Sequence, residues 1–134
     1  MNKYVIGFDF GLKYIGLAVG EHITNKAWPL KTLWAYNGIP NWILLDKLIF
    51  DWNPSKFVLG VSYGYYLSSK TVVHYAKIFK KNLNYRYNLP IYEINEDFTT
   101  YEAKKIYKQN KIKKKVYEIH SLSAAVILES WLNY

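Results

Sequence analysis

The chain has 134 residues, enough for one domain, and 51% of them are hydrophobic, which excludes a disordered protein. It contains no cysteine, so structural disulfides and zinc sites built on thiolates are excluded. Its 18 basic residues outnumber its 10 acidic residues, and the net charge of +8 favours a polyanionic partner such as nucleic acid over a merely soluble basic surface.

No apolar stretch of the sequence reaches the roughly 20 residues that a membrane-spanning helix needs. The short apolar run at the N-terminus is interrupted by Asp9, and no small-residue cleavage site of a signal peptide follows it. We therefore expect a cytoplasmic protein without a membrane partner. The length predicts one domain that spans residues 1–134.

The first three predicted elements are strands. Residues 4–10 and 14–20 are apolar and β-prone, and a turn at residues 11–13 joins them into a hairpin. Residues 27–33 form a third predicted strand, in which Pro29 suits only an edge or an end.

Helices and strands alternate through the next part of the chain. Pro40 suits the first turn of a helix, and apolar residues at helical spacing continue this helix over residues 45–52. Residues 56–61 are a nearly continuous apolar run, which is typical of a buried parallel strand. A second helix is predicted over residues 72–83 and a further strand over residues 90–95.

Two helices are predicted in the C-terminal part. Thr99 and Glu102 have the spacing of a capping box, which predicts a helix that starts at Thr99. A lysine-rich loop at residues 111–115 precedes a last helix over residues 122–132, with Ser121 as its predicted N-cap. The element order predicts an α/β fold with a mixed five-stranded sheet, in which three leading antiparallel strands are followed by parallel strands and helices cover both faces.

Asp9 is the first candidate catalytic residue. It ends the predicted central strand, where a carboxylate removed from water is costly, and Gly11 lets the chain behind it turn tightly or approach a ligand. In open α/β sheets, functional sites gather at the carboxyl ends of the strands. The alternative interpretation is an aspartate that closes a hairpin turn.

Glu96 and Asp97 follow another predicted strand and should also lie at a carboxyl end. The alternative is the acidity common at helix starts, an interpretation that is stronger for Asp97 than for Glu96. Two carboxylates that converge from separate strand ends can hold Mg²⁺ against a phosphodiester. Asp9 and Glu96 are therefore the candidate metal ligands.

A group of lysines follows Glu96 in the sequence, and Lys13 lies in the turn after Asp9. We predict that these lysines contact the phosphates of a nucleic acid; the alternative is a solvated lysine face enriched by the codon usage of an AT-rich genome. The lysines after Glu96 are Lys104, Lys105, Lys108, Lys111, Lys113, Lys114 and Lys115.

Four motifs occur in order along nearly the whole chain, at residues 7–20 (Gly-Phe-Asp-Phe-Gly-Leu-Lys-Tyr-Ile-Gly-Leu-Ala-Val-Gly), 58–61, 95–103 and 120–128. Together they resemble the YqgF family of bacterial Holliday-junction-resolvase-like proteins, which are also described as pre-16S rRNA nucleases. The resemblance implies a ribonuclease-H-like fold, metal-dependent cleavage and a role in maturing the 5′ end of small-subunit rRNA, which is part of ribosome biogenesis.

The sequence departs from the family pattern at several polar positions. Asp9 and Glu96 match acidic positions, but Asn95 stands where Asp is usual, Asp97 where Arg is usual, and His120 where the third active-site Asp is usual. Histidine coordinates Mn²⁺ or Zn²⁺ better than Mg²⁺, and it can also act as an acid or base near neutral pH. His120 is thus the third candidate catalytic residue, with reduced activity as the alternative, and the expected cofactor is Mg²⁺ or Mn²⁺.

Three functions follow from these observations and stay open here. The first is an endonuclease that acts on precursor rRNA, and the second is the same chemistry on four-way DNA junctions. The third is a nucleic-acid-binding remnant without catalysis, which the loss of the third carboxylate would explain. The expected oligomeric state is a monomer or a homodimer.

Overall fold

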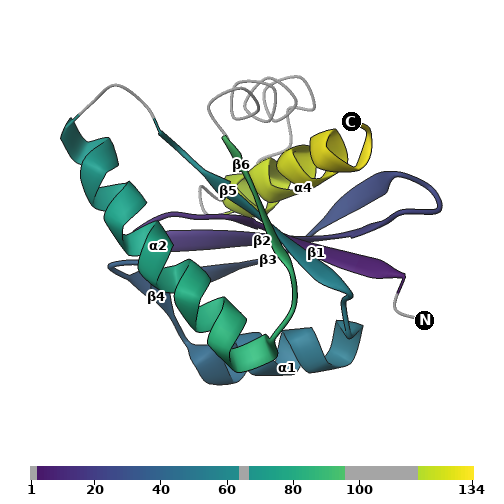
Figure 1. Cartoon of the computed structure of the whole chain (residues 1–134), viewed down its shortest axis with the longest axis horizontal. Helices are drawn as coiled ribbons and strands as arrows, with labels where there is room; N and C mark the ends of the chain where they lie inside the picture. Colours follow the sequence, from purple (N-terminus) through teal and green to yellow (C-terminus); the bar gives the residue numbers. More distant parts are fainter. Residues whose placement is uncertain (1–2, 64–66, 96–117) are drawn as a thin grey trace.

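The computed structural model describes residues 3–63, 67–95 and 118–134, and its centre is a mixed β-sheet (Figure 1). The strands lie in the order β4-β3-β2-β1-β5-β6. Their bounds are β1 (Tyr4–Asp9), β2 (Tyr14–Glu21), β3 (Lys26–Tyr36), β4 (Ile39–Pro40), β5 (Lys56–Val61) and β6 (Ile91–Asn95).

The pairing pattern confirms the predicted mixed sheet. β1, β2, β3 and β4 pair with one another in succession as antiparallel strands, whereas β5 is parallel to both β1 and β6. Within the described residues the sheet has six strands instead of the five predicted, because a two-residue strand, β4, adds to its edge. A strand of two residues has too little apolar alternation to be recognised in a sequence.

Helices cover both faces of the sheet, as predicted. Figure 1 shows α1 (Trp42–Trp52) and α2 (Leu67–Tyr87) on one face and α4 (Glu118–Leu132) on the other. The helix predicted to start at Thr99 and the lysine-rich loop lie outside the described residues. Within the described part of the chain, no helix combines the length and the apolar character needed to cross a membrane.

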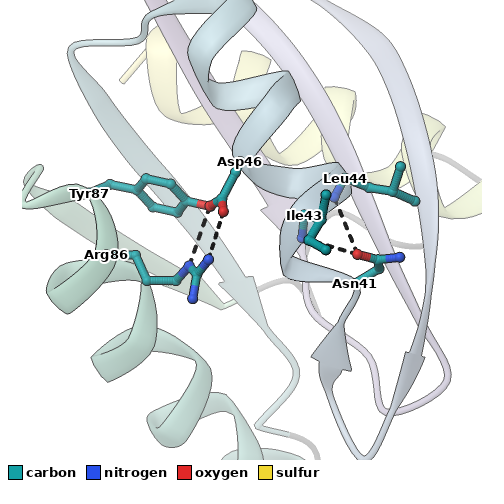
Figure 2. Close-up of polar contacts among 6 residues, drawn as sticks. All are labelled: Asn41, Ile43, Leu44, Asp46, Arg86 and Tyr87. Carbon is teal, nitrogen blue, oxygen red and sulfur yellow. Dashed lines mark hydrogen bonds and ion pairs between the residues drawn. The ribbon is translucent and has the colours of Figure 1, made fainter.

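The start of α1 differs from the prediction. Pro40 belongs to β4, and Asn41 is the N-cap: its side-chain oxygen accepts hydrogen bonds from the backbone N–H groups of Ile43 at 3.0 Å and Leu44 at 3.3 Å (Figure 2). Asparagine satisfies N–H groups that have no partner inside the helix, so the helix starts after Asn41 rather than at the proline.

A polar cluster joins α1 to the end of α2. Asp46 accepts hydrogen bonds from Arg86 Nη2 at 2.7 Å and from the Tyr87 hydroxyl at 2.6 Å (Figure 2). These hydrogen bonds lower the pKa of Asp46, whereas burial and the bond to Asp46 raise the pKa of Tyr87. The Arg86 guanidinium also lies 4.8 Å from the centre of the Trp42 ring. These contacts fix the two helices of this face to each other.

Pro29 occupies an open edge, in agreement with its prediction. Leu17 pairs with Lys31 but Ala18 pairs with Pro29, so the register shifts and Leu30 is an extra residue on β3. Among the described residues, the other side of β3 pairs only with the short β4. Because proline has no N–H to donate, an irregular stretch of an edge strand is where a sheet tolerates it.

The sheet separates two apolar cores of different character. The core under α1 and α2 contains large side chains such as Phe8, Phe57 and Phe79, whereas the core under α4 contains much smaller ones. Glycines of the sheet face α4 at positions where an added Cβ would meet that helix, and they are Gly7, Gly16, Gly20 and Gly60. The small residues that α4 buries in return are Ser121, Ser123, Ala124 and Ala125. Small residues on both sides allow α4 to lie close to the sheet.

Candidate functional site

Asp9 is the last residue of the central strand β1, and its neighbours across the sheet are both glycines. Its Cα partners are Gly16 on β2 and Gly60 on β5. Only 7% of Asp9 is exposed, which distinguishes it from the solvated aspartate of an ordinary hairpin turn. A buried carboxylate is costly, which keeps Asp9 a candidate functional residue.

Several strands meet at the end of the sheet where Asp9 lies, which we call the carboxyl rim. The parallel strands β1, β5 and β6 end there, at Asp9, Val61 and Asn95. The antiparallel strand β2 starts there at Tyr14, which pairs with Trp34 near the end of β3. This is the rim at which open α/β sheets carry their functional sites.

His120 lies in the first turn of α4 and belongs to the same site as Asp9. Burial lowers the pKa of His120, and the negative charge of Asp9 acts in the opposite direction and raises it. The lowering by burial is the larger effect, so the imidazole is mainly neutral at pH 7. A neutral imidazole can bind a metal ion or accept a proton.

The position of His120 depends on Gly16. A Cβ atom at Gly16 would overlap the backbone of His120 and Ser121, so only glycine allows the start of α4 to lie on β2. The prediction that Ser121 caps this helix is wrong, because α4 already includes Glu118. Ser121 is instead buried inside the helix, where its hydroxyl donates a hydrogen bond to the Glu118 carbonyl at 3.0 Å. A serine hydroxyl can hydrogen-bond to the backbone both at an N-cap and inside a helix, so the presence of a serine did not distinguish the two positions.

Lys13 is exposed at the carboxyl rim, where a phosphate contact was predicted. Its ammonium nitrogen lies 5.5 Å from the centre of the Tyr14 ring and 6.0 Å from that of Trp34. Sequence reasoning did not identify these two aromatic residues, because the chain has 14 tyrosines and 5 tryptophans and nothing in the sequence distinguishes one from another.

The remaining predicted site residues lie outside the described residues. They are Glu96, Lys104, Lys105, Lys108, Lys111, Lys113, Lys114 and Lys115. The described chain leaves β6 at Asn95, which is at the carboxyl rim, and Glu96 is the next residue in the sequence. The proximity of Glu96 to Asp9 and the basic patch therefore stay predictions.

The donor atoms around Asp9 are chemically suited to a divalent ion. The described residues contain no group of three or more acidic, histidine or cysteine side chains that could hold a metal. They do bring together a carboxylate oxygen of Asp9 and the neutral imidazole of His120. This mixed pair suits Mn²⁺ well, whereas Mg²⁺ would need more oxygen ligands, for which Glu96 remains the predicted source.

The interaction between Asp9 and His120 leads to a prediction about titration. In the metal-free protein, His120 is expected to titrate below 6.5, and Asp9→Asn should lower its pKa further because the carboxylate that raises it is lost. Histidine NMR signals followed over pH would measure both values. His22 is the internal control, because its pKa is also lowered by burial, but with Lys56 as its charged neighbour. A His120 pKa that stays the same or rises in the variant would contradict the shared site.

The chain is similar to a known family and to known proteins over nearly its whole length. A family model described as "RuvX: Holliday junction resolvase" matches residues 3–134. A relative from Buchnera aphidicola subsp. Acyrthosiphon pisum (strain APS), named "Putative pre-16S rRNA nuclease", is 44% identical over 131 residues, which are 96% of this chain and 97% of the relative. A relative of the same name from Francisella tularensis subsp. novicida (strain U112) is 38% identical over 134 residues, which are 99% and 98% of the two chains.

Two solved structures share the fold. The structure of T. thermophilus RuvC in complex with a Holliday junction substrate aligns with a TM-score of 0.58 and 15% identity, over 96% of this chain and 92% of that chain. The Fowlpox virus resolvase in complex with Holliday junction DNA aligns with a TM-score of 0.57 and 14% identity, over 97% of both chains. These likenesses confirm the ribonuclease-H-like fold that the motifs implied. The family match over residues 3–134 and the 44% identical relative show that the chain belongs to the RuvX family, also called YqgF.

Proposed function

We propose that this protein is a metal-dependent endonuclease that cleaves precursor 16S rRNA during maturation of its 5′ end. The observation that carries the proposal is the buried carboxylate of Asp9 at the carboxyl rim, with the neutral imidazole of His120 in the same site. Relatives named as pre-16S rRNA nucleases, at 38% to 44% identity over nearly the whole chain, support this substrate. We further propose that residues 1–134 form one nuclease domain and that it acts in the cytoplasm.

Each residue has a distinct proposed role. A bound Mg²⁺ or Mn²⁺ ion would supply Lewis acidity toward the phosphodiester. Asp9 and Glu96 are the residues that would hold it, and the neutral His120 is suited to complete the ligand set or to accept a proton at its free ring nitrogen. Lys13 and the lysines after Glu96 would hold the phosphates of the backbone, which fixes the register of the strand without reading its sequence.

A cleavage assay tests the proposal directly. The purified protein would be incubated with a precursor 16S rRNA fragment that includes the unprocessed 5′ end, with Mg²⁺ or Mn²⁺ and with EDTA as the control. We expect metal-dependent cleavage at a defined position near the mature 5′ end. Binding without cleavage under both metals would reject the enzyme and leave a nucleic-acid-binding remnant.

Resolution of four-way DNA junctions is the second candidate, because the matching family model is described as a Holliday junction resolvase. A four-way junction is symmetric, so its resolution needs two sites that act together and hence a homodimer, whereas a monomer is sufficient for a single cut in rRNA. A synthetic junction in the same assay, with the oligomeric state measured by light scattering, separates the two substrates. Faster cleavage of the junction by a dimer would favour the second candidate.

The His120→Asp variant tests the assignment of the third ligand. We expect it to raise Mg²⁺-supported cleavage by about tenfold, because a carboxylate oxygen is a better ligand for Mg²⁺ than an imidazole nitrogen. Rates measured over a range of Mg²⁺ and of Mn²⁺ concentrations would also show a smaller preference for Mn²⁺. His120→Asn is the matched control, since it removes the imidazole without adding a charge. Unchanged or lower activity in His120→Asp would mean that the histidine itself is required or that this position does not hold the metal.

A further inference from the structure

Three rings make contact in a row that starts beside Asp9 and runs across the sheet. His120 stacks on Tyr14 with 4.9 Å between ring centres and 24° between ring planes. Tyr14 in turn contacts Trp34, with 4.8 Å between ring centres and a tilt of 50°. We call His120, Tyr14 and Trp34 the aromatic row. Its rings come from α4, β2 and β3, in that order.

Exposure increases along the aromatic row away from Asp9. His120 and Tyr14 are partly buried, whereas 65% of Trp34 is exposed, the largest exposure of any tryptophan in the chain. The three tryptophans that are not exposed pack on other aromatic rings: Trp42 on Phe79, Trp52 on Tyr4, and Trp131 on Tyr92. Trp34 therefore keeps a large aromatic surface open to solvent at the rim that carries the candidate site.

A positive charge lies against the same rings. The exposed ammonium group of Lys13 lies 6.0 Å from the centre of the Trp34 ring and 5.5 Å from that of Tyr14. An open aromatic ring next to a cation is the combination that proteins use for single-stranded nucleic acid, in which the base stacks and the phosphate pairs with the charge. The net charge of +8 makes the whole molecule complementary to such a partner.

We propose that Trp34 is a stacking platform for an unpaired nucleobase of the strand that is cleaved at Asp9, and that Lys13 holds a phosphate of the same segment. The proposal rests on the proposed nuclease function, since it identifies that strand with the substrate. In a continuous duplex both faces of a base are covered by its neighbours, so only an unpaired base can offer a free face to Trp34. The enzyme should therefore prefer substrates that are single-stranded next to the scissile phosphate. Because stacking does not involve the 2′-hydroxyl, it applies to RNA and DNA alike.

Binding without metal tests stacking separately from cleavage. Fluorescein-labelled single-stranded RNA, single-stranded DNA of the same sequence and a blunt RNA duplex of the same length would be titrated in EDTA. We expect Trp34→Ala to weaken binding of both single strands by about tenfold or more, the effect typical of losing one base stack, and to leave duplex binding within about twofold. Trp34→Phe keeps an aromatic face and should restore most of the affinity.

Trp28→Ala is the matched control, because Trp28 also lies on β3 and is 46% exposed, but its partner Val19 belongs to the core on the opposite face of the sheet. It should bind all three nucleic acids like the wild type. A second readout does not depend on the alanine variant: single-stranded RNA should quench tryptophan fluorescence of the wild type, and most of this quenching should be absent in Trp34→Phe.

The proposal is overturned if Trp34→Ala binds single strands like the wild type, or if it loses duplex and single-strand binding equally. Quenching by single-stranded RNA that persists undiminished in Trp34→Phe would also overturn it. These outcomes are distinct from failure of the nuclease proposal, which would appear as absence of metal-dependent cleavage by the wild type. A wild type that does not cleave, but binds single strands through Trp34, would keep the stacking site and reject only its link to cleavage.

Discussion

Asp9→Asn is expected to reduce metal-dependent cleavage of precursor rRNA by roughly 10²- to 10³-fold, the loss typical when one preorganised charge is removed from an active site. Asparagine has nearly the same shape as aspartate but lacks the charge that attracts a divalent ion. Asp9 is 7% exposed and lies between two glycines of the sheet, so no neighbouring side chain on those strands can take its place. Single-turnover rates at saturating Mg²⁺ or Mn²⁺ would measure the loss.

Substrate binding separates a catalytic role of Asp9 from a structural one. Removal of one negative charge from a basic protein should leave the affinity for RNA unchanged or slightly higher. Asp51→Asn is the matched control, since Asp51 is an exposed carboxylate on α1, on the other face of the sheet. It should cleave at the wild-type rate. If Asp9→Asn cleaves within about threefold of the wild-type rate, Asp9 is not a catalytic residue, and the nuclease proposal loses its basis.

Gly16→Ala is expected to lower the free energy of unfolding by about 3 kcal/mol, at the upper end for overpacking. The new methyl group would overlap the backbone of α4 at His120 and Ser121, and backbone atoms cannot rotate away as a side chain can. The helix must therefore shift, and His120 would lose its position beside Asp9. Urea unfolding would measure the change in stability, and the cleavage assay would report the accompanying loss of activity.

Gly7→Ala is the control for the same substitution under the same helix. A methyl group there would meet Leu128, with the nearest atom, its Cβ, at 2.9 Å, which is a milder overlap than the one with the α4 backbone at Gly16. We expect a clearly smaller loss of stability and little change in cleavage, because Gly7 faces Leu128, about two turns of α4 away from His120. Equal losses of cleavage activity in the two variants would mean that the position of His120 does not depend specifically on Gly16.

Most of the fold could be predicted because the apolar pattern of this chain is regular. The run at residues 56–61 became β5 with the expected bounds, since residues 57–61 are all buried and both faces of the strand are covered. The errors occurred where one residue type suits two local structures. Pro40 is compatible with a helix start and with an edge strand. Ser121 is compatible with an N-cap and with a buried position inside a helix. In both cases the packing against distant residues decided which structure formed.

The candidate site was only partly predictable. Asp9 became a candidate from the sequence, because it ends an apolar strand, and the structure adds that it is only 7% exposed. His120 entered through the family resemblance alone, since nothing within its own segment relates it to a residue more than a hundred positions earlier. Trp34 was not identified, because its exposure and its contact with Tyr14 depend on the pairing of β2 with β3.

The amino-acid sequence by itself determined the α/β class, the strand that carries Asp9 and the basic character that suits nucleic acid, because these follow from local periodicity and net charge. Only the tertiary structure decided that α4 lies directly on Gly16, which brings His120 next to Asp9 and starts the aromatic row. Close packing is the physical reason: how near a helix can come to a sheet depends on side chains from distant segments, and local patterns contain no information about which of these segments meet.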